Sequence, residues 1–128
     1  LFDTKISVLK LFPGFDPEII DKVLERKAHG IILEGFGPGN VPSNIISKIE
    51  KCTKQGVPLV LANQMENGVT NIASYAVGYQ AEQAGALSSK DMTTESTVSK
   101  LMWVLAQTRK LSEIRSLMES DLAGEMSA

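Results

Sequence analysis

The chain has 128 residues, of which 43% are hydrophobic and 22% are charged, and its formal net charge is −2 at pH 7. This length fits a single domain with its own core, and the near balance of charge argues against the broad basic surface that nucleic acid binding requires. No apolar run approaches the ~20 residues that cross a bilayer, so a membrane partner is not expected either.

The first part of the chain predicts a strand, a turn and a helix. Polar and apolar residues alternate with period two from Lys5 to Leu11, which is typical of a strand. The residues from Phe12 to Phe15 then predict a Pro-Gly turn. Asp16 is the predicted N-cap of a helix with one apolar face, and this helix is expected to end near Lys27.

The central part predicts two strands that are buried on both faces. Gly30 to Glu34 (GIILE) is almost entirely apolar, as is Val57 to Ala62 (VPLVLA). Between them lie the glycine-rich loop Gly35 to Val41 and a helix for which Ser43 is the predicted cap. The second strand leads into a polar loop rich in turn-forming residues, Asn63 to Asn71.

The last part predicts three helices and a short edge strand. A helix with small residues along one side is expected over Ile72 to Ala84, and a strand over Ala86 to Ser88. Thr93 or Thr94 is expected to start the next helix, and Ser112 the final one. Strands separated by helices imply right-handed βαβ crossovers. The predicted fold class is therefore α/β, with a small open parallel sheet flanked by helices.

This architecture brings the loops that follow the strands to one edge of the sheet. Ligands of open α/β sheets bind beyond the carboxyl ends of the strands. The loops after the second and third strands hold most of the candidate polar residues: Asn40, Asn63, Gln64, Glu66, Asn67, Thr70 and Asn71. We therefore expect the functional surface at this edge.

The glycine-rich loop itself admits two interpretations. Gly35, Gly37 and Gly39 follow a strand and precede a helix, as in phosphate-binding loops. Their spacing does not match GxGxxG, however, and no GK[ST] follows. A sharp turn that brings backbones close together is the favoured interpretation. Asn40 would then present an amide, able to donate and to accept hydrogen bonds, to a small polar ligand.

Catalytic motifs are scarce in this chain. It contains neither a GxSxG elbow nor an HExxH pair. Glu34, Glu66 and Asp91 lie near predicted strand ends, so a carboxylate pair is conceivable. Asp91 is more readily explained as a partner for backbone N–H groups at the following helix start.

The single cysteine and the single histidine limit metal and redox chemistry. Cys52 cannot form an intrachain disulfide, which fits a reducing compartment such as the cytoplasm. It falls on the apolar stripe of a predicted helix and is expected to be a small buried hydrophobe. His29 excludes a histidine-rich zinc site, and its place after a predicted helix end favours a capping role.

A series of strings, in order along the chain, resembles one known family. The string from Gly30 to Pro42 (GIILEGFGPGNVP) looks like the hallmark loop of type I L-asparaginases. The other matching strings are Leu11–Gly14 (LFPG), Tyr75–Gly78 (YAVG), Ala84–Gly85, Asp91–Glu95 (DMTTE) and Lys100–Leu101. The resemblance covers nearly the whole chain and is to the C-terminal domain of that family.

The resemblance implies an enzyme of two α/β domains that hydrolyses L-asparagine to L-aspartate and ammonia without a cofactor. Residues 1–128 would be its Rossmann-like C-terminal domain. The larger N-terminal domain would supply a threonine nucleophile and a threonine–lysine–aspartate group. Because Leu1 is not a methionine, we expect the chain to be cut from a longer one. On its own, the chain is then expected to be inactive and to hold no catalytic residue.

The resemblance also implies which residues bind substrate. C-terminal domains of this family complete the site of a neighbouring subunit in an intimate dimer, so a homo-oligomer is expected. The matching positions are Asn40, in the glycine-rich loop, and Tyr75, which offers a hydroxyl on a rigid ring. Without the resemblance, Tyr75 is equally well explained as a packing residue.

Departures from the family pattern keep alternatives open. Relatives that asparagine activates carry an arginine where Glu34 stands and a cysteine near Met65, so no effector site of that kind is expected. Glu34 also resembles the related subunit of an archaeal tRNA-dependent amidotransferase, an ammonia-producing enzyme, whereas the GNVP continuation favours the asparaginase branch. A non-catalytic oligomerisation or interaction module is a further alternative, and the preference for asparagine or glutamine stays open.

Overall fold

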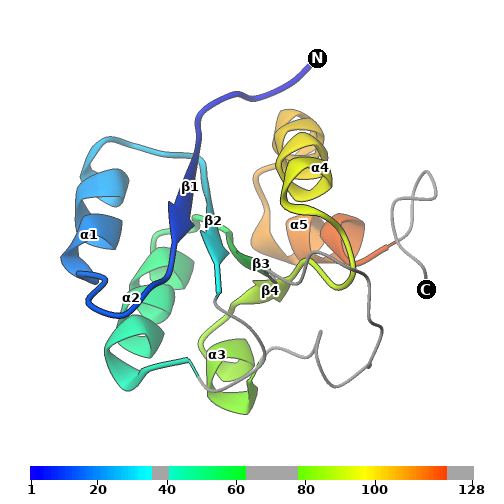
Figure 1. Cartoon of the computed structure of the whole chain (residues 1–128). Helices are drawn as coiled ribbons and strands as arrows, with labels where there is room; N and C mark the ends of the chain where they lie inside the picture. Colours follow the sequence, from blue (N-terminus) through cyan, green and yellow to red (C-terminus); the bar gives the residue numbers. More distant parts are fainter. Residues whose placement is uncertain (36–40, 63–77, 121–128) are drawn as a thin grey trace.

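The structure is a computed structural model that describes residues 1–35, 41–62 and 78–120. Strands and helices alternate along the chain, as the sequence predicts (Figure 1). The elements are β1 (Ile6–Lys10), α1 (Glu18–Glu25), β2 (Gly30–Glu34), α2 (Ser43–Lys54), β3 (Leu59–Ala62), α3 (Tyr79–Gln83), β4 (Leu87–Ser88), α4 (Thr94–Gln107) and α5 (Leu111–Met118).

The four strands form one parallel sheet in the order β1-β2-β3-β4. Val8 pairs with Ile32, Ile32 with Val60, and Val60 with Leu87. Each strand follows its neighbour after a helical crossover, so the strand order is the chain order. The predicted α/β class and the open parallel sheet are thus confirmed.

Helices cover both faces of the sheet, and each face has its own core (Figure 1). Ile31 and Leu33 of β2 pack in the core that α1, α2 and α3 share. Ile32, between them, packs in the core of α4 and α5. This division follows from the alternation of side chains along a strand, and it explains why Ile31, Ile32 and Leu33 of β2 are all apolar.

Helices α1, α2 and α3 each end in a Schellman motif that leads into the next strand. The residue that turns the chain has positive φ in each case: Lys27 (63°), Gly56 (77°) and Gly85 (108°). The N–H two residues beyond each C-cap reaches back to a helical carbonyl, as Val57 does to Cys52 and Ala86 to Ala81. Because glycine accepts this conformation without strain, Lys27 is the unusual member of the set.

The start of α2 corrects the sequence prediction. Ser43 makes no capping hydrogen bond and is itself the first residue of α2. The extended Pro42 is the cap instead, and its carbonyl accepts the N–H groups of Ile45 and Ile46. By contrast, Thr93 caps α4 as predicted, since its Oγ1 accepts from the N–H of Ser96 at 3.0 Å.

The helix predicted over Ile72 to Ala84 is wrong at Gly78. That residue is extended, with φ −56° and ψ 148°, and α3 begins only at Tyr79. Glycine gains nothing from a helical conformation and loses more conformational freedom in it than other residues, so it ends the run of helix formers. Residues 72–77 lie outside the described part. The final helix begins at Leu111, one residue before the predicted Ser112.

Candidate functional site

The carboxyl ends of the strands meet at one edge of the sheet, as the sequence predicts. Lys10 lies in register with Glu34, and Glu34 with Ala62. Gly35 donates its N–H to the carbonyl of Ala62 at 2.8 Å. The glycine-rich loop and the polar loop therefore leave the sheet from adjacent strands, β2 and β3.

The predicted substrate-binding residues, Asn40 and Tyr75, lie outside the described residues. The same holds for most of the other polar candidates: Asn63, Gln64, Glu66, Asn67, Thr70 and Asn71. Their positions remain predictions. Gly35 and Val41 are the described residues on either side of the first of these segments, and Ala62 and Gly78 those on either side of the second.

These flanking residues enclose a pocket of about 240 Å³ at the starts of α2 and α3. The lining residues are Val41, Ile46, Gly78, Tyr79, Gln80 and Ala81. Its volume is below the ~300 Å³ at which pockets for drug-sized ligands begin, so it suits a ligand of amino-acid size.

The pocket is next in sequence to both predicted substrate residues. Val41 directly follows Asn40, and Gly78 closes the YAVG string that Tyr75 opens. Sequence reasoning named neither Ile46 nor Gln80 as a site residue. An exposed amide in the first turn after YAVG would have been the signal for Gln80.

Glu34 is held by the start of α4. Its Oε2 accepts a hydrogen bond of 2.8 Å from Oγ1 of Thr94. The bond joins the end of β2 to the first turn of α4, across 60 residues of chain. One oxygen of the Glu34 carboxylate therefore has a structural role. The carboxylate pair that the sequence allows between Glu34 and Glu66 stays a prediction, because Glu66 lies outside the described residues.

Backbone strain marks the loop between β4 and α4. Lys90 has φ 54°, a conformation that costs a non-glycine residue energy. The hydroxyl of its neighbour Ser89 is buried and, among the described residues, has no hydrogen-bond partner. Strained backbone at the ligand-binding edge of an α/β sheet is common at functional sites.

Cys52 behaves as predicted. Its side chain is fully buried in the core beneath α2. Burial raises the pKa of its thiol to about 11, so the thiol stays protonated and is not a nucleophile.

His29 does not cap a helix, which corrects the prediction. The carbonyls at the end of α1 accept instead from the N–H groups of Lys27 and Ala28. Nδ1 of His29 lies 2.7 Å from Oδ2 of Asp3, just before the amino-terminal end of β2. The chain's only histidine is therefore at the edge of the sheet opposite the candidate site.

Metal and membrane signatures were also sought in residues 1–35, 41–62 and 78–120. No three histidine, cysteine, aspartate or glutamate side chains in these ranges are placed to hold a metal ion. None of the helices in the same ranges combines the length and apolar character needed to span a bilayer.

Residues 5–118 match the family model described as Glutaminase/Asparaginase C-terminal domain. A subunit of the glutamyl-tRNA(Gln) amidotransferase of Aeropyrum pernix is 41% identical over 126 residues, which are 98% of this chain and 30% of the relative. The L-asparaginase of Thermococcus kodakarensis is 37% identical over 127 residues, which are 97% of this chain and 38% of the relative.

Solved structures agree with these sequence matches. The thermostable L-asparaginase from Thermococcus kodakarensis superimposes with a TM-score of 0.86 and 38% identity, over 99% of this chain and 39% of the other. L-asparaginase I from Vibrio cholerae gives a TM-score of 0.84 and 31% identity, over 98% and 38%. The chain thus spans between 30% and 39% of the length of these relatives.

Proposed function

Since the chain belongs to the family of glutaminase/asparaginase C-terminal domains, we propose that it is the C-terminal domain of an L-asparaginase-like amidohydrolase that converts L-asparagine to L-aspartate and ammonia. The observation that carries the proposal is the match of nearly the whole chain to a solved L-asparaginase, with a TM-score of 0.86 and 38% identity. No cofactor is invoked for this reaction.

The attacking group is proposed to lie outside this chain, on a threonine of an N-terminal domain. The described residues support this division of labour. Cys52 is buried and protonated, and His29 lies at the opposite edge of the sheet, paired with Asp3. Neither is placed to serve as a nucleophile or a general base at the candidate site.

The proposed contribution of this domain is to position the substrate. Asn40 would hold the α-ammonium or the carboxylate of asparagine through its amide, and Tyr75 would offer its hydroxyl. The adjacent pocket of about 240 Å³ supports this assignment, because its size suits an amino acid. Holding a substrate in the reactive geometry is a substantial share of catalysis. We propose further that these residues serve the site of a neighbouring subunit in a homo-oligomer, in the cytoplasm.

Ammonia release tests the proposal. The complete protein that contains this chain should release ammonia from L-asparagine, whereas residues 1–128 alone should release none. Tyr75→Phe in the complete protein should lower kcat/KM. Ser99→Ala, which removes an exposed hydroxyl from α4 away from the pocket, is the control and should leave kcat/KM unchanged. A complete protein without amidase activity would favour a non-catalytic oligomerisation or interaction module.

A second candidate is an ammonia-producing subunit of an amidotransferase. It is favoured by the higher identity to the amidotransferase subunit of Aeropyrum pernix, 41% against 37% for the L-asparaginase of Thermococcus kodakarensis. Co-purification with a partner protein, and ammonia production that rises when the partner is added, would identify this function. Activity of the protein alone on free asparagine, unchanged by any partner, would exclude it.

A further inference from the structure

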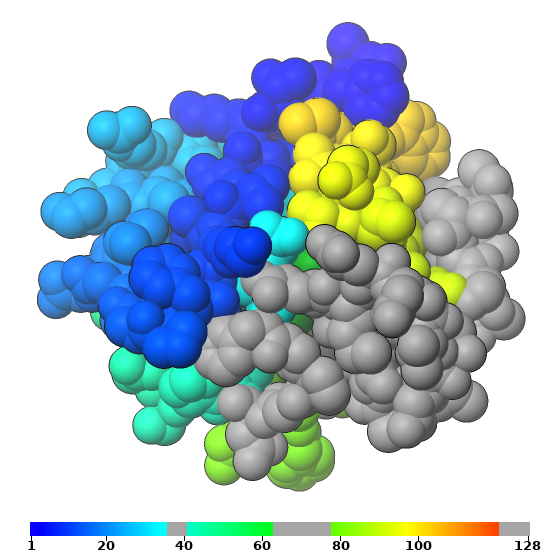
Figure 2. Space-filling view, in the orientation of Figure 1, coloured from blue at the N-terminus to red at the C-terminus, as the bar shows by residue number. Residues whose placement is uncertain are grey.

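Among the described helices, α3 is the shortest and the one that buries the least apolar surface. Of its five residues only Ala81 is buried, whereas α1 buries both Ile20 and Leu24. Figure 2 shows α3, in light green, at the rim of the molecule. A helix of this length is not stable by itself in water. The position of α3 must therefore be fixed by contacts other than its own apolar burial.

A hydroxyl group of α2 holds the carboxyl end of α3 on one face of the sheet. Oγ1 of Thr53 lies 2.8 Å from the carbonyl oxygen of Ala84, the C-cap of α3, and 3.0 Å from the carbonyl oxygen of Ile49 in its own helix. The single hydroxyl hydrogen is shared between these two acceptors. The last carbonyls of a helix have no partner within it, so Thr53 binds a group that α3 leaves open.

An arginine of α5 holds the same end of α3 from the other face of the sheet. Nη2 of Arg115 donates to the carbonyl of Gly85 at 3.2 Å, and its Nη1 lies 3.8 Å from a carboxylate oxygen of Glu119. Helix α5 packs in the core on the opposite face of the sheet from α2 and α3. Two consecutive carbonyls at the end of α3 are thus bound from both sides of the sheet.

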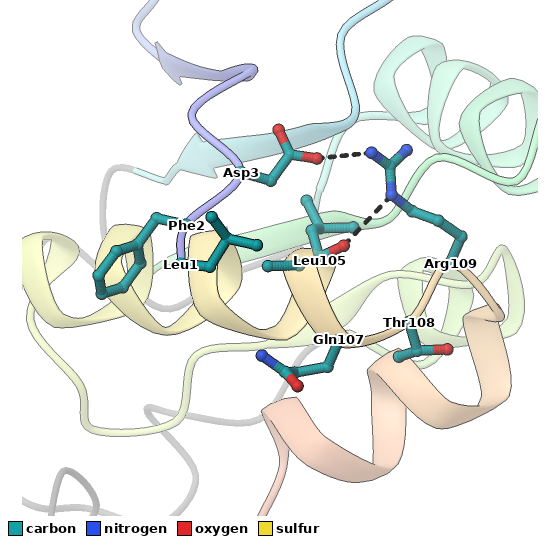
Figure 3. A pocket seen from close by; sticks show the side chains of 8 residues that line it. Leu1, Phe2, Asp3, Leu105, Gln107, Thr108 and Arg109 are labelled. Carbon is teal, nitrogen blue, oxygen red and sulfur yellow. Dashed lines mark hydrogen bonds and ion pairs between the residues drawn. The ribbon is translucent and has the colours of Figure 1, made fainter.

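The end of α4 is closed in a different way. Arg109 follows this helix, and its Nε donates to the carbonyl of Leu105 at 3.3 Å, four residues earlier in the chain (Figure 3). Its Nη2 donates to Asp3, ahead of β1 (Figure 3). Neither contact joins two helices, whereas Arg115 joins α5 to the end of α3.

The helices that Thr53 joins at their carboxyl ends also line the pocket near their amino-terminal ends. Both α2 and α3 connect neighbouring parallel strands on the same face of the sheet, so they run in the same direction. Ile46 of α2 faces Tyr79, Gln80 and Ala81 of α3 across a pocket of about 240 Å³. Because α3 is only ~7.5 Å long, a tilt about its carboxyl end changes the width of this pocket directly.

We propose that Thr53 and Arg115 are positioning residues, which hold the carboxyl end of α3 and thereby set the width of the pocket between α2 and α3. The inference rests on the proposed function, in which this pocket adjoins the residues that bind the amino-acid substrate. Neither Thr53 nor Arg115 is among the residues that line the pocket. Both act on the substrate through α3.

Hydrogen exchange in the complete protein that contains this chain tests whether the two residues hold α3. The informative amides are those of Glu82, Ala84 and Gly85, whose acceptors lie in α3 or at its N-cap. Thr53→Ala and Arg115→Met should each speed the exchange of these amides about twofold to tenfold, as loss of one hydrogen bond implies. The amides of β2 and β3 should keep their wild-type rates.

Thr53→Ser and Glu119→Gln are the matched controls. Serine lacks the methyl group of threonine but keeps the hydroxyl, so its comparison with Thr53→Ala isolates the hydrogen bond to Ala84. Glu119→Gln removes the ion pair of Arg115 but leaves its hydrogen bond to Gly85. Both controls should leave exchange in α3 close to the wild-type rates.

The kinetics of ammonia release from L-asparagine test the consequence for the substrate. Thr53→Ala and Arg115→Met should raise KM about threefold or more and change kcat less, because they loosen the binding pocket while the attacking group lies elsewhere. The two control variants should keep the wild-type KM. A purely structural role would lower the urea midpoint of Thr53→Ala and Arg115→Met and leave their KM unchanged.

Two results would overturn the inference. Unchanged exchange of the α3 amides in both variants would show that α3 is held without Thr53 and Arg115. Faster exchange with an unchanged KM would show that the position of α3 does not affect the substrate. If the complete wild-type protein releases no ammonia, the proposed function fails and the role in substrate binding fails with it, whereas the exchange rates still decide whether Thr53 and Arg115 hold α3.

Discussion

Replacing Gly85 with alanine should destabilise this domain far more than the same change at Gly56, although both glycines end a helix. Both have positive φ, 108° and 77°, so both substitutions force alanine into a conformation that costs about 1–2 kcal/mol. Reduced freedom of the unfolded chain returns part of that cost, about 0.4–1 kcal/mol. At Gly56 no steric cost is added to this backbone strain, because a Cβ there would meet no atom within 4 Å.

At Gly85 the new Cβ would clash with Thr53. It would lie 2.2 Å from Oγ1 and 2.8 Å from Cγ2 of that residue. Thr53 cannot simply turn away, since its hydroxyl donates to the carbonyls of Ile49 and Ala84 at 3.0 and 2.8 Å. Overpacking of this kind costs about 1–3 kcal/mol. We therefore expect Gly56→Ala to cost about 1 kcal/mol, and Gly85→Ala about 3 kcal/mol.

Urea unfolding followed by circular dichroism measures the loss of unfolding free energy in each variant, provided that the slope of this free energy against urea concentration is unchanged. The double variant Thr53→Ala/Gly85→Ala then isolates the clash, because it removes the two closest atoms. It should lose clearly less stability than the sum of its single variants. Equal losses for Gly56→Ala and Gly85→Ala, or additivity in the double variant, would refute the packing argument and leave backbone strain alone.

Three further changes test other parts of the structure. Lys27→Gly should raise the urea midpoint, corresponding to about 0.5–1 kcal/mol, because Lys27 occupies a left-handed conformation (φ 63°) that glycine adopts freely; an unchanged or lower midpoint would contradict this. Asn40→Ala should lower kcat/KM for asparagine about tenfold in the complete protein, as loss of one substrate hydrogen bond implies. The control is Asn44→Ala, at an exposed residue of α2, which should leave kcat/KM unchanged. Equal kinetics of the two variants would remove Asn40 from the site. Hydrogen bonds from Lys48 and Lys51 lower the pKa of Asp21. The stabilising effect of its carboxylate is therefore present above the ordinary aspartate pKa and is lost as pH falls through the lowered pKa. The difference in unfolding free energy between wild type and Asp21→Asn should shrink between about pH 6 and pH 2, and a constant difference would rule out that linkage.

The pattern of polar and apolar residues, together with the turn-forming residues between them, was enough to predict the parallel sheet and the edge where its strands end. The apolar runs at Gly30 to Glu34 and before Ala62 are typical of strands covered on both sides, and the helix between them indicates parallel pairing, which the structure confirms. The predicted end of the helix at Ala84 agrees with the C-cap of α3 in the structure. These signals are local, because each depends on residues within one or two turns of the chain.

The tertiary structure decided what depends on residues that are distant in the sequence. No local signal joins Asp3 to His29 and Arg109, which lie 26 and 106 residues further along, or Glu34 to Thr94. Even the role of His29 was predicted from its sequence neighbours and came out differently, since the end of α1 is closed by backbone N–H groups and the imidazole is left for Asp3. The physical reason is that a polar side chain takes whichever partner the packed elements bring within about 3 Å, and only the assembled sheet and helices determine that partner.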